Sequence, residues 1–293
     1  MIFVIGGVTA SGKSDLAFRL AKAINGIVIN ADAFAFYKEL EIGTAKPSAE
    51  ELNAVPTFLF NNISLDERFS IYNYQKEARA ILTKYHAENI PIIFVGGSGL
   101  YLKAVLYNYN LQPEKELIIE DDPNISNETL HQELVLLDPK AAAKIHPNNR
   151  KRVLRALAII RAHDKTKTEM EKATTNTPVF PYIMICLDKE NEVLYRDIET
   201  RTKLMFDKGL KKEALALNAK YSQNAQGMQA IGYKEILQNP GISDKELMDL
   251  ISLRTRQYAK RQRTFFRHQF KAKWFTDADE AYEYLLEKYE ELK

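Results

Sequence analysis

The sequence predicts an α/β fold of the P-loop type, in which a mainly parallel sheet is flanked by helices and carries a small helical insertion domain. Two observations lead to this prediction. At the start of the chain, a strand runs through a glycine-rich turn into a helix, and up to Tyr107 short apolar segments alternate with amphipathic ones. Such alternation is typical of parallel sheets that helices cover on both faces.

The N-terminal part supplies strands and helices in alternation. The predicted strands are residues 2–5, 26–29 and 91–95, which are rich in Ile, Val and Phe. The predicted helices are residues 13–24, residues 70–88 and a segment that begins at Leu100; in the first two, apolar residues recur at helical spacing.

The alternation breaks at Tyr107. Residues 107–128 are rich in Asn, Pro and acidic side chains and indicate a loop. Helical patterns follow over 130–137, 140–145 and 150–162, a strand is predicted at 179–187, and further helices are predicted over 189–220, 228–238, 243–271 and 277–291. We therefore assign residues 1–110 and 178–293 to the P-loop core with basic C-terminal helices, and residues 111–177 to the helical insertion.

Composition excludes several classes of protein. The chain of 293 residues has 45% hydrophobic and 27% charged residues, which is typical of a globular protein. Its single cysteine, Cys186, excludes an internal disulfide and a four-thiolate zinc site. No apolar run approaches the ~20 residues that span a membrane. We expect a soluble, cytoplasmic protein without a membrane partner.

The first glycine-rich turn fits the P-loop pattern G-x-x-x-x-G-K-[ST] between a strand and a helix. In such a loop the backbone N–H groups point at phosphate oxygens, and the N-terminus of the following helix adds partial positive charge. Lys13 adds a full charge, and the Ser14 hydroxyl can ligate Mg²⁺. The sequence therefore predicts a site for a di- or triphosphate, ATP among the possibilities. Its residues are Gly7, Val8, Thr9, Ala10, Ser11, Gly12, Lys13 and Ser14.

The acid of the site is less obvious. ATPases usually carry an Asp at the end of a long apolar strand, but the strand at 91–95 ends in Gly-Gly-Ser-Gly. The candidate acid is Asp32, just beyond the second strand, where parallel-sheet enzymes place site residues. On that fact alone, a single Asp after a strand is more often a helix cap than a functional residue.

Basic residues are concentrated near the C-terminus, although the net charge is only +2. Between Arg254 and Lys273 there are eight Lys or Arg residues and no Asp or Glu. Charge alone leaves two interpretations open, a solvated helix face and a surface for nucleic acid.

Several motifs occur together. They are Thr9–Ser14, Asp32 with Tyr37, Ile42–Pro47, Val95–Tyr101, Ile145–Asn148, Arg152–Leu157, Gln229–Lys234 and Ala259–Arg267. In this order and at these spacings they resemble the tRNA dimethylallyltransferases, also called tRNA isopentenyltransferases. The resemblance spans nearly the whole chain, and its last motif is highly specific.

This resemblance implies transfer of a dimethylallyl group from dimethylallyl diphosphate to N6 of an adenosine beside the anticodon of tRNA. The P-loop would hold the prenyl diphosphate with Mg²⁺, for which Ser14 is the metal-ligating hydroxyl, and neutralise the leaving group. Asp32 matches the family's general base, which would take the proton from N6. Thr9, Ser98 and Arg201 match catalytic or diphosphate-site residues of the family.

The resemblance also gives the basic segment a function. Its cations can neutralise backbone phosphates of an anticodon stem-loop, whose stacked target base must be extruded. The expected tRNA-contacting residues are Asp32, Ala33, Phe34, Ala35, Lys151, Arg152, Arg155, Gln229, Gly232, Tyr233, Lys234, Lys260, Arg261, Arg263 and Arg267. We expect tRNA and dimethylallyl diphosphate as partners, and a monomer.

The chain departs from the family at two places. Where the family has Asp-Ser-x-Gln-x-Tyr, this chain has Asp32-Ala33-Phe34-Ala35-Phe36-Tyr37, and where it commonly has His-His-Leu-Ile-Asp, this chain has residues 57–61, Thr-Phe-Leu-Phe-Asn. These losses leave the diphosphate site intact but remove polar groups that could orient the base. The alternatives are an adenine-nucleotide prenyltransferase, a P-loop kinase and a non-catalytic RNA-binding relative.

Overall fold

The computed structural model describes residues 1–109, 111, 119, 121–163, 165–166, 168–169, 175, 177–222 and 224–293. The chain divides into two compact units. The first comprises residues 1–69, 74–105 and 180–293, and the second comprises residues 70–73 and 106–179. The predicted insertion, 111–177, lies inside the second unit.

The described residues of the first unit form a six-stranded sheet in the order β3-β2-β4-β1-β5-β6. All its neighbouring strands pair in parallel, which confirms the predicted fold class. The strands are β1 (Ile2–Gly7), β2 (Ile27–Asn30), β3 (Thr57–Phe58), β4 (Ile92–Val95), β5 (Ile183–Leu187) and β6 (Lys273–Phe275). The central strands β1, β2 and β4 are buried along their whole length, as their continuous apolar runs require.

Among the described elements, two strands and one helix were not predicted from the sequence. The strands are β3 and β6, and the helix is α2 (Ala49–Ala54). Each is too short for a periodic pattern of apolar residues to develop. The predicted strand at 179–187 is also shorter in the structure, where β5 begins at Ile183.

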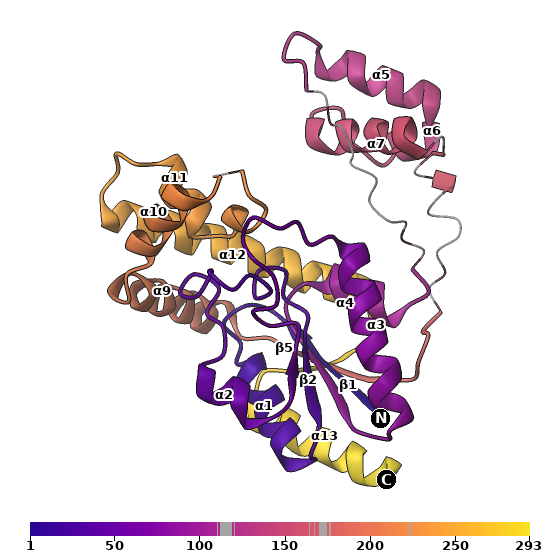
Figure 1. Cartoon of the computed structure of the whole chain (residues 1–293), viewed down its shortest axis with the longest axis vertical. Helices are drawn as coiled ribbons and strands as arrows, with labels where there is room; N and C mark the ends of the chain where they lie inside the picture. The colour runs from indigo at the N-terminus through magenta and orange to yellow at the C-terminus, as the bar shows by residue number, and fades with distance from the viewer. Residues whose placement is uncertain are drawn as a thin grey trace. The chain divides into compact units, whose positions relative to one another are not determined.

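Helices cover both faces of the sheet (Figure 1). The helices α1 (Lys13–Ala23) and α13 (Ala278–Leu292) pack together against side chains of β1, β2, β4 and β5 in one buried cluster. The crossovers that contain α3 (Ile71–Ala87) and α4 (Gly99–Leu106) return in the opposite direction across the sheet. Because such crossovers are right-handed, these helices lie on the other face.

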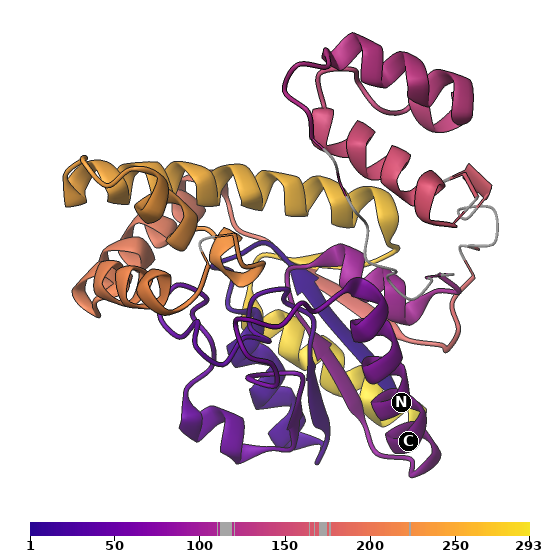
Figure 2. The same cartoon turned by 45° about the horizontal axis from the view of Figure 1, so that its top comes forward.

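Two of the helices predicted in the C-terminal part are divided into shorter elements in the structure. The predicted helix 189–220 is split into α9 (Asn191–Asp207) and α10 (Leu210–Lys220) by Gly209, whose φ of +97° favours glycine. The segment 228–238 becomes a 3₁₀ turn, η1 (Gly227–Gln229), and α11 (Tyr233–Gln238). Helix α12 (Asp244–Gln269) begins at a capping box of Ser243 and Glu246. It passes the carboxyl ends of the strands (Figure 2).

The regular secondary structure described in the second unit is helical, apart from an isolated bridge between Tyr107 and Pro178. Its helices are α5 (Asn127–Leu137), α6 (Pro139–Ala142) and α7 (Arg150–His163). Leu130, Leu134, Val153 and Leu157 form its core. Within the described ranges of both units, no helix combines the length and the apolar character needed to cross a membrane.

Candidate active site

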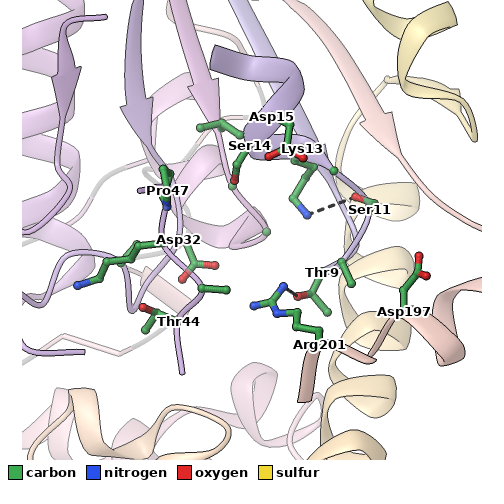
Figure 3. Close-up of a pocket in the computed structure, with 18 of the residues that line it drawn as sticks. Thr9, Ser11, Lys13, Ser14, Asp15, Asp32, Thr44, Pro47, Asp197 and Arg201 are labelled. Atoms are coloured by element: carbon green, nitrogen blue, oxygen red, sulfur yellow. Dashed lines mark hydrogen bonds between the residues drawn. The ribbon is translucent and has the colours of Figure 1, made fainter. Parts of the chain in front are cut away.

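The loops that follow β1, β2 and β4 meet at one edge of the sheet, because these neighbouring strands are parallel. A cavity of about 520 Å³, hereafter the first cavity, opens between these loops and helices α9 and α12. Figure 3 shows the side chains that project into it. Ligands of parallel α/β sheets bind at this kind of position.

Residues 9–14 of the predicted P-loop line the first cavity, but the first two residues of the motif do not. At Gly7, where φ is +122°, a Cβ atom would lie 2.1 Å from the carbonyl oxygen of Leu187. The Val8 side chain is buried, and its N–H donates to the same carbonyl at 3.1 Å. Gly7 and Val8 therefore pack against β5, and the Val8 N–H is bonded to that strand and not to a phosphate.

Lys13, at the first turn of α1, points its ammonium group back over the loop (Figure 3). It donates to the Val8 carbonyl and lies 3.5 Å from Ser11 Oγ. Burial lowers the pKa of Lys13 to about 8; the carboxylate of Asp32 opposes this shift and the guanidinium of Arg201 adds to it. A bound anion would supply the negative counter-charge that the buried ammonium lacks.

Asp32 is held just beyond β2 by a short network. Its N–H donates to Asn30 Oδ1 at 2.8 Å, and its own Oδ1 accepts the N–H of Phe34 at 3.0 Å. Asn30 is 1% exposed and is anchored in turn by donation to the Leu59 carbonyl at 2.8 Å. Asp32 thus caps a local turn with one oxygen while its carboxylate lines the cavity.

Arg201 reaches the same place from α9. Its Nη1 lies 3.3 Å from Thr9 Oγ1, to which it donates (Figure 3). Burial lowers the pKa of Arg201, and the charge of Asp32 opposes that shift. Three predicted catalytic residues, Thr9, Asp32 and Arg201, therefore line one cavity although they are far apart in the sequence.

A second cavity of about 290 Å³ adjoins this group. It shares Thr9, Asp32, Thr44 and Arg201 with the first cavity. Its other walls are mainly apolar or aromatic; they include Phe34, Ile198, Met205, Ile231, Ile251 and Tyr258. Burial raises the pKa of the Tyr258 hydroxyl, as does the charge of Asp32. A carboxylate, a guanidinium and two hydroxyl groups therefore lie where the charged first cavity meets the mainly apolar second cavity.

Ser98 and the residues after Asp32 take different positions. Ser98 Oγ accepts the N–H of Ala33 at 3.1 Å, so this hydroxyl fixes the Asp32 loop and lines neither cavity. Ala35 lines the first cavity and Phe34 the second. The structure therefore gives Ser98 a positioning contact in place of the predicted contact with a ligand.

The basic residues of α12 divide into two groups. Lys260, Arg261 and Arg267 are exposed, and Arg261 lies near the mouth of the second cavity with its guanidinium 5.8 Å from the Tyr258 ring centre. Arg263 instead faces inward, where it donates to both oxygens of Asp188 at 2.7 Å and to Asn191 Oδ1 at 3.0 Å. In this structure the Arg263 guanidinium is paired with Asp188, so the predicted contact of Arg263 with tRNA requires it to leave that carboxylate.

The motif at 229–234 is also largely internal. Tyr233 is fully buried; its hydroxyl accepts the N–H of Gly43 at 3.0 Å and donates to Glu213 Oε1 at 3.1 Å. Gly232 is buried with a φ of +103°. Both predicted tRNA contacts are therefore buried in this structure, and Tyr233 supports the loop that carries Thr44. Gln229 lines the second cavity, and Lys234 is half-buried.

The remaining predicted tRNA contacts lie on α7 in the second unit. Lys151, Arg152 and Arg155 are exposed on this helix, whose other face packs into the unit's core through Val153 and Leu157. This arrangement leaves three cations on one surface of the unit.

Sequence reasoning missed three residues that build the site. Asn30 and Gln262 support the loops and, like Thr44, line the first cavity. All three lie in or beside quoted motifs: Asn30 shortly before Asp32, Thr44 in Ile42–Pro47 and Gln262 in Ala259–Arg267. The sequence signal available for Gln262 was an uncharged polar residue between the cations Arg261 and Arg263.

A magnesium ion of the P-loop kind fits the residues present. The Ser14 hydroxyl lies at the start of α1 in the first cavity, which also holds the Asp32 carboxylate. Among the described residues there is no group of three or more His, Cys, Asp or Glu able to hold a metal by themselves. The donor set is therefore one in which phosphate oxygens and water must supply most of the ligands.

The family model for IPP transferase matches residues 35–269 of the chain. A tRNA dimethylallyltransferase of Oceanobacillus iheyensis is 38% identical over 97% of this chain and 95% of its own length. The tRNA dimethylallyltransferase of Halalkalibacterium halodurans is 39% identical over 95% of this chain and 92% of its own.

Solved structures agree with these relatives. The tRNA isopentenylpyrophosphate transferase of Staphylococcus epidermidis has a TM-score of 0.73 at 30% identity, and the match covers 100% of this chain and 99% of that one. A eukaryotic dimethylallyltransferase acting on tRNA has a TM-score of 0.80 at 28% identity, covering 95% of this chain and 74% of that one.

Proposed function

The chain belongs to the IPP transferase family, the family of the tRNA dimethylallyltransferases, and from this premise we propose that it is a tRNA dimethylallyltransferase. It transfers the dimethylallyl group of dimethylallyl diphosphate to N6 of an adenosine beside the anticodon. The observation that carries the proposal is the group of four residues shared by a charged cavity and an apolar one.

In this proposal the first cavity holds the diphosphate. Lys13, Arg201 and the hydroxyl groups of the loop face that cavity and neutralise or hydrogen-bond its oxygens. When bound through phosphate oxygens and Ser14, Mg²⁺ supplies further positive charge at the leaving group. The dimethylallyl carbon then lies at the shared residues, where the two cavities join.

The second cavity receives the extruded adenine. Phe34 and Tyr258 give it flat aromatic walls, which suit a base taken out of its stack. The N6 lone pair forms the new bond to C1 of the dimethylallyl group, while the C1–O bond breaks and its electron pair leaves with the diphosphate. Asp32 accepts the proton that N6 gives up, because its carboxylate borders both cavities.

Arg201 and Thr9 fix the position of the diphosphate relative to the general base. The donation from Arg201 to Thr9 leaves the guanidinium between the P-loop and Asp32, so one cation faces both the departing diphosphate and the general base. The charge of Asp32 and that of Arg201 balance one another before substrate binds. All these groups come from a single chain, so we propose that the monomer is the active form.

The test is incubation of the protein with labelled dimethylallyl diphosphate and, separately, with total tRNA, AMP or ATP. Label in tRNA supports the proposal. Label in AMP or ATP alone identifies an adenine-nucleotide prenyltransferase, and turnover of ATP to ADP without prenyl transfer identifies a kinase. Binding of tRNA without any transfer identifies a non-catalytic relative. Analytical ultracentrifugation of the active sample decides the oligomeric state.

A further inference from the structure

The side-chain amide of Gln262 lies between two loops of the first cavity. Gln262 is on α12 and is 5% exposed. Its Oε1 accepts the N–H of Thr9 at 2.8 Å, and its Nε2 donates to the carbonyl of Gly97 at 3.0 Å. One buried planar group is therefore satisfied at both ends by backbone atoms of loops that follow different strands, β1 and β4.

This link continues to the loop that carries Asp32. Gly97 is followed by Ser98, whose N–H donates to the Ala31 carbonyl at 3.1 Å and whose Oγ accepts the N–H of Ala33 at 3.1 Å. Ala31 and Ala33 flank Asp32. The amide of Gln262 thus completes a chain of contacts from Thr9 to the backbone on both sides of Asp32.

The surrounding packing leaves little room for this amide to move. A Cβ atom at Gly97 would lie 2.1 Å from Nε2 of Gln262, so glycine there makes room for the contact. The next residue of α12, Arg263, is held by Asp188, and one turn onward the ring of Phe266 packs 2.7 Å from where a Cβ of Gly6 would be. The register of α12 against the strand ends is therefore fixed at three successive contacts.

We propose that Gln262 is a positioning residue for prenyl transfer, which fixes Thr9, and with it Arg201, relative to Asp32. This inference rests on the proposed function. It needs an acceptor and a donor on one rigid group, and a glutamine amide supplies both. A displacement of about 1 Å between reacting groups can cost roughly 100-fold in rate, so a residue that sets the spacing of Thr9 and Asp32 can control the chemical step.

The same contact connects the reacting groups to the exposed cations of α12. Lys260 and Arg261 immediately precede Gln262 and face solvent. One turn of α12 therefore connects the cations that a polyanion would bind to the residue that sets the spacing of Thr9 and Asp32.

Two substitutions distinguish the contributions of the two hydrogen bonds of the amide. Gln262→Met removes both hydrogen bonds at similar volume, and Gln262→Glu keeps an acceptor for Thr9 but places a negative oxygen against the Gly97 carbonyl. The matched control is Leu247→Val, which loosens a buried position of α12 that lines neither cavity. For each variant we would measure melting temperature, the affinities for dimethylallyl diphosphate and for tRNA, and the single-turnover rate at saturation.

We expect both Gln262 variants to lose roughly 10- to 100-fold in the single-turnover rate, with both affinities retained. Leu247→Val should lower the melting temperature and keep the rate. A Gln262→Met enzyme with the wild-type rate overturns the inference, and so does an equal loss of rate in Leu247→Val at the same loss of melting temperature.

Amide hydrogen exchange makes the outcome independent of the reaction. If Gln262 ties the loops, Gln262→Met should speed exchange in peptides that contain Thr9 and Ala33, and Leu247→Val should not. Should the wild-type protein transfer nothing to tRNA, the proposed function fails, while this exchange measurement still decides whether Gln262 holds the loops together.

Discussion

The two cavities share four residues, yet their walls are assembled in opposite ways. Six consecutive residues, Thr9–Ser14, from the P-loop and the first turn of α1 form one wall of the first cavity, and many of its lining side chains are charged or carry a hydroxyl group. The second cavity draws mainly apolar side chains from segments near residues 34, 200, 230 and 255. The first can hold an anion by charge and N–H groups, and the second can hold a flat apolar group by shape.

This difference predicts that the two substrates respond to different mutations. Variants of the first cavity should change the handling of the diphosphate, and variants of the second should change the handling of the base. Changes at the shared Asp32, or at Gln262, which positions Thr9 relative to Asp32, should affect the transfer step while leaving both affinities in place.

The largest effect is expected at a shared residue. Asp32→Asn keeps an oxygen able to accept the Phe34 N–H, so the local turn should survive. It removes the group that accepts the N6 proton, and the single-turnover rate should fall by about 10²–10⁴-fold, the usual contribution of a general base. Affinity for tRNA should persist in a filter-binding assay. A near-normal rate would remove Asp32 from the mechanism.

A smaller effect is expected at the first cavity alone. Lys13→Ala deletes an ammonium that faces the diphosphate site, and hydrogen bonds to charged groups are worth about 1.5–3 kcal/mol, or roughly 10- to 150-fold in affinity. Calorimetry should show this loss for dimethylallyl diphosphate, with tRNA affinity unchanged. If tRNA binding collapses while diphosphate affinity survives, the assignment of the two cavities is reversed.

The pH dependence of the same binding sharpens this test. Because burial lowers the pKa of Lys13 to about 8, the free site carries its charge below that pH and loses it above. Diphosphate affinity in the wild-type protein should weaken as the pH rises through about 8. Binding should take up a proton there, since the anion raises the pKa of Lys13. Lys13→Ala should abolish this step, and an unaltered pH profile in that variant would assign it to another group.

The second cavity is tested at Phe34. Stacking of a base on an aromatic side chain is worth about 1–3 kcal/mol by alanine substitution, so Phe34→Ala should weaken productive tRNA binding roughly 5- to 150-fold. Phe34→Tyr keeps the flat face and serves as the matched control. Dimethylallyl diphosphate should bind both variants equally well. A Phe34→Ala enzyme with normal tRNA kinetics would show that the base does not stack there.

The contrast between the cavities also explains how far the sequence could be interpreted. The P-loop and Asp32 follow strands directly, so a local pattern placed them, and the parallel sheet brought them together. The second cavity depends on packing between α9, η1 and α12, which no local spacing encodes. Its polar supports, such as the hydrogen bond between Glu213 and Tyr233, have the same limitation.

The charge pattern of α12 shows the same limit at single residues. Arg261 and Arg263 are two positions apart and look equivalent in the sequence, but they lie on different faces of the helix. The partner of Arg263 is Asp188, 75 residues away, and only the folded chain brings them within 2.7 Å. The helix predicted at 243–271 is α12, but the sequence left undecided which of its cations face solvent and which face the core.

The smallest effects are expected on the exposed face of α12, and they separate its two groups of cations. Each phosphate that Lys260 or Arg261 neutralises should add about 0.7–0.9 to the slope of log K against log [salt]. Lys260→Ala with Arg261→Ala should therefore weaken tRNA binding and reduce that slope by about 1.5, at an unchanged melting temperature. Arg263→Ala should do the reverse, because it removes the two-point ion pair of the buried Asp188 and leaves Arg267, at 3.9 Å, as its remaining ion-pair partner among the described residues: the melting temperature falls and the slope stays. Titrations of tRNA at several salt concentrations, with a thermal melt of each variant, decide between the two faces.

Equal slopes in the wild-type and the double variant would show that these cations only solvate the helix, as exposed ion pairs and cations commonly do at ~0–1 kcal/mol each. A slope that falls in Arg263→Ala would instead show that this arginine leaves Asp188 when tRNA binds.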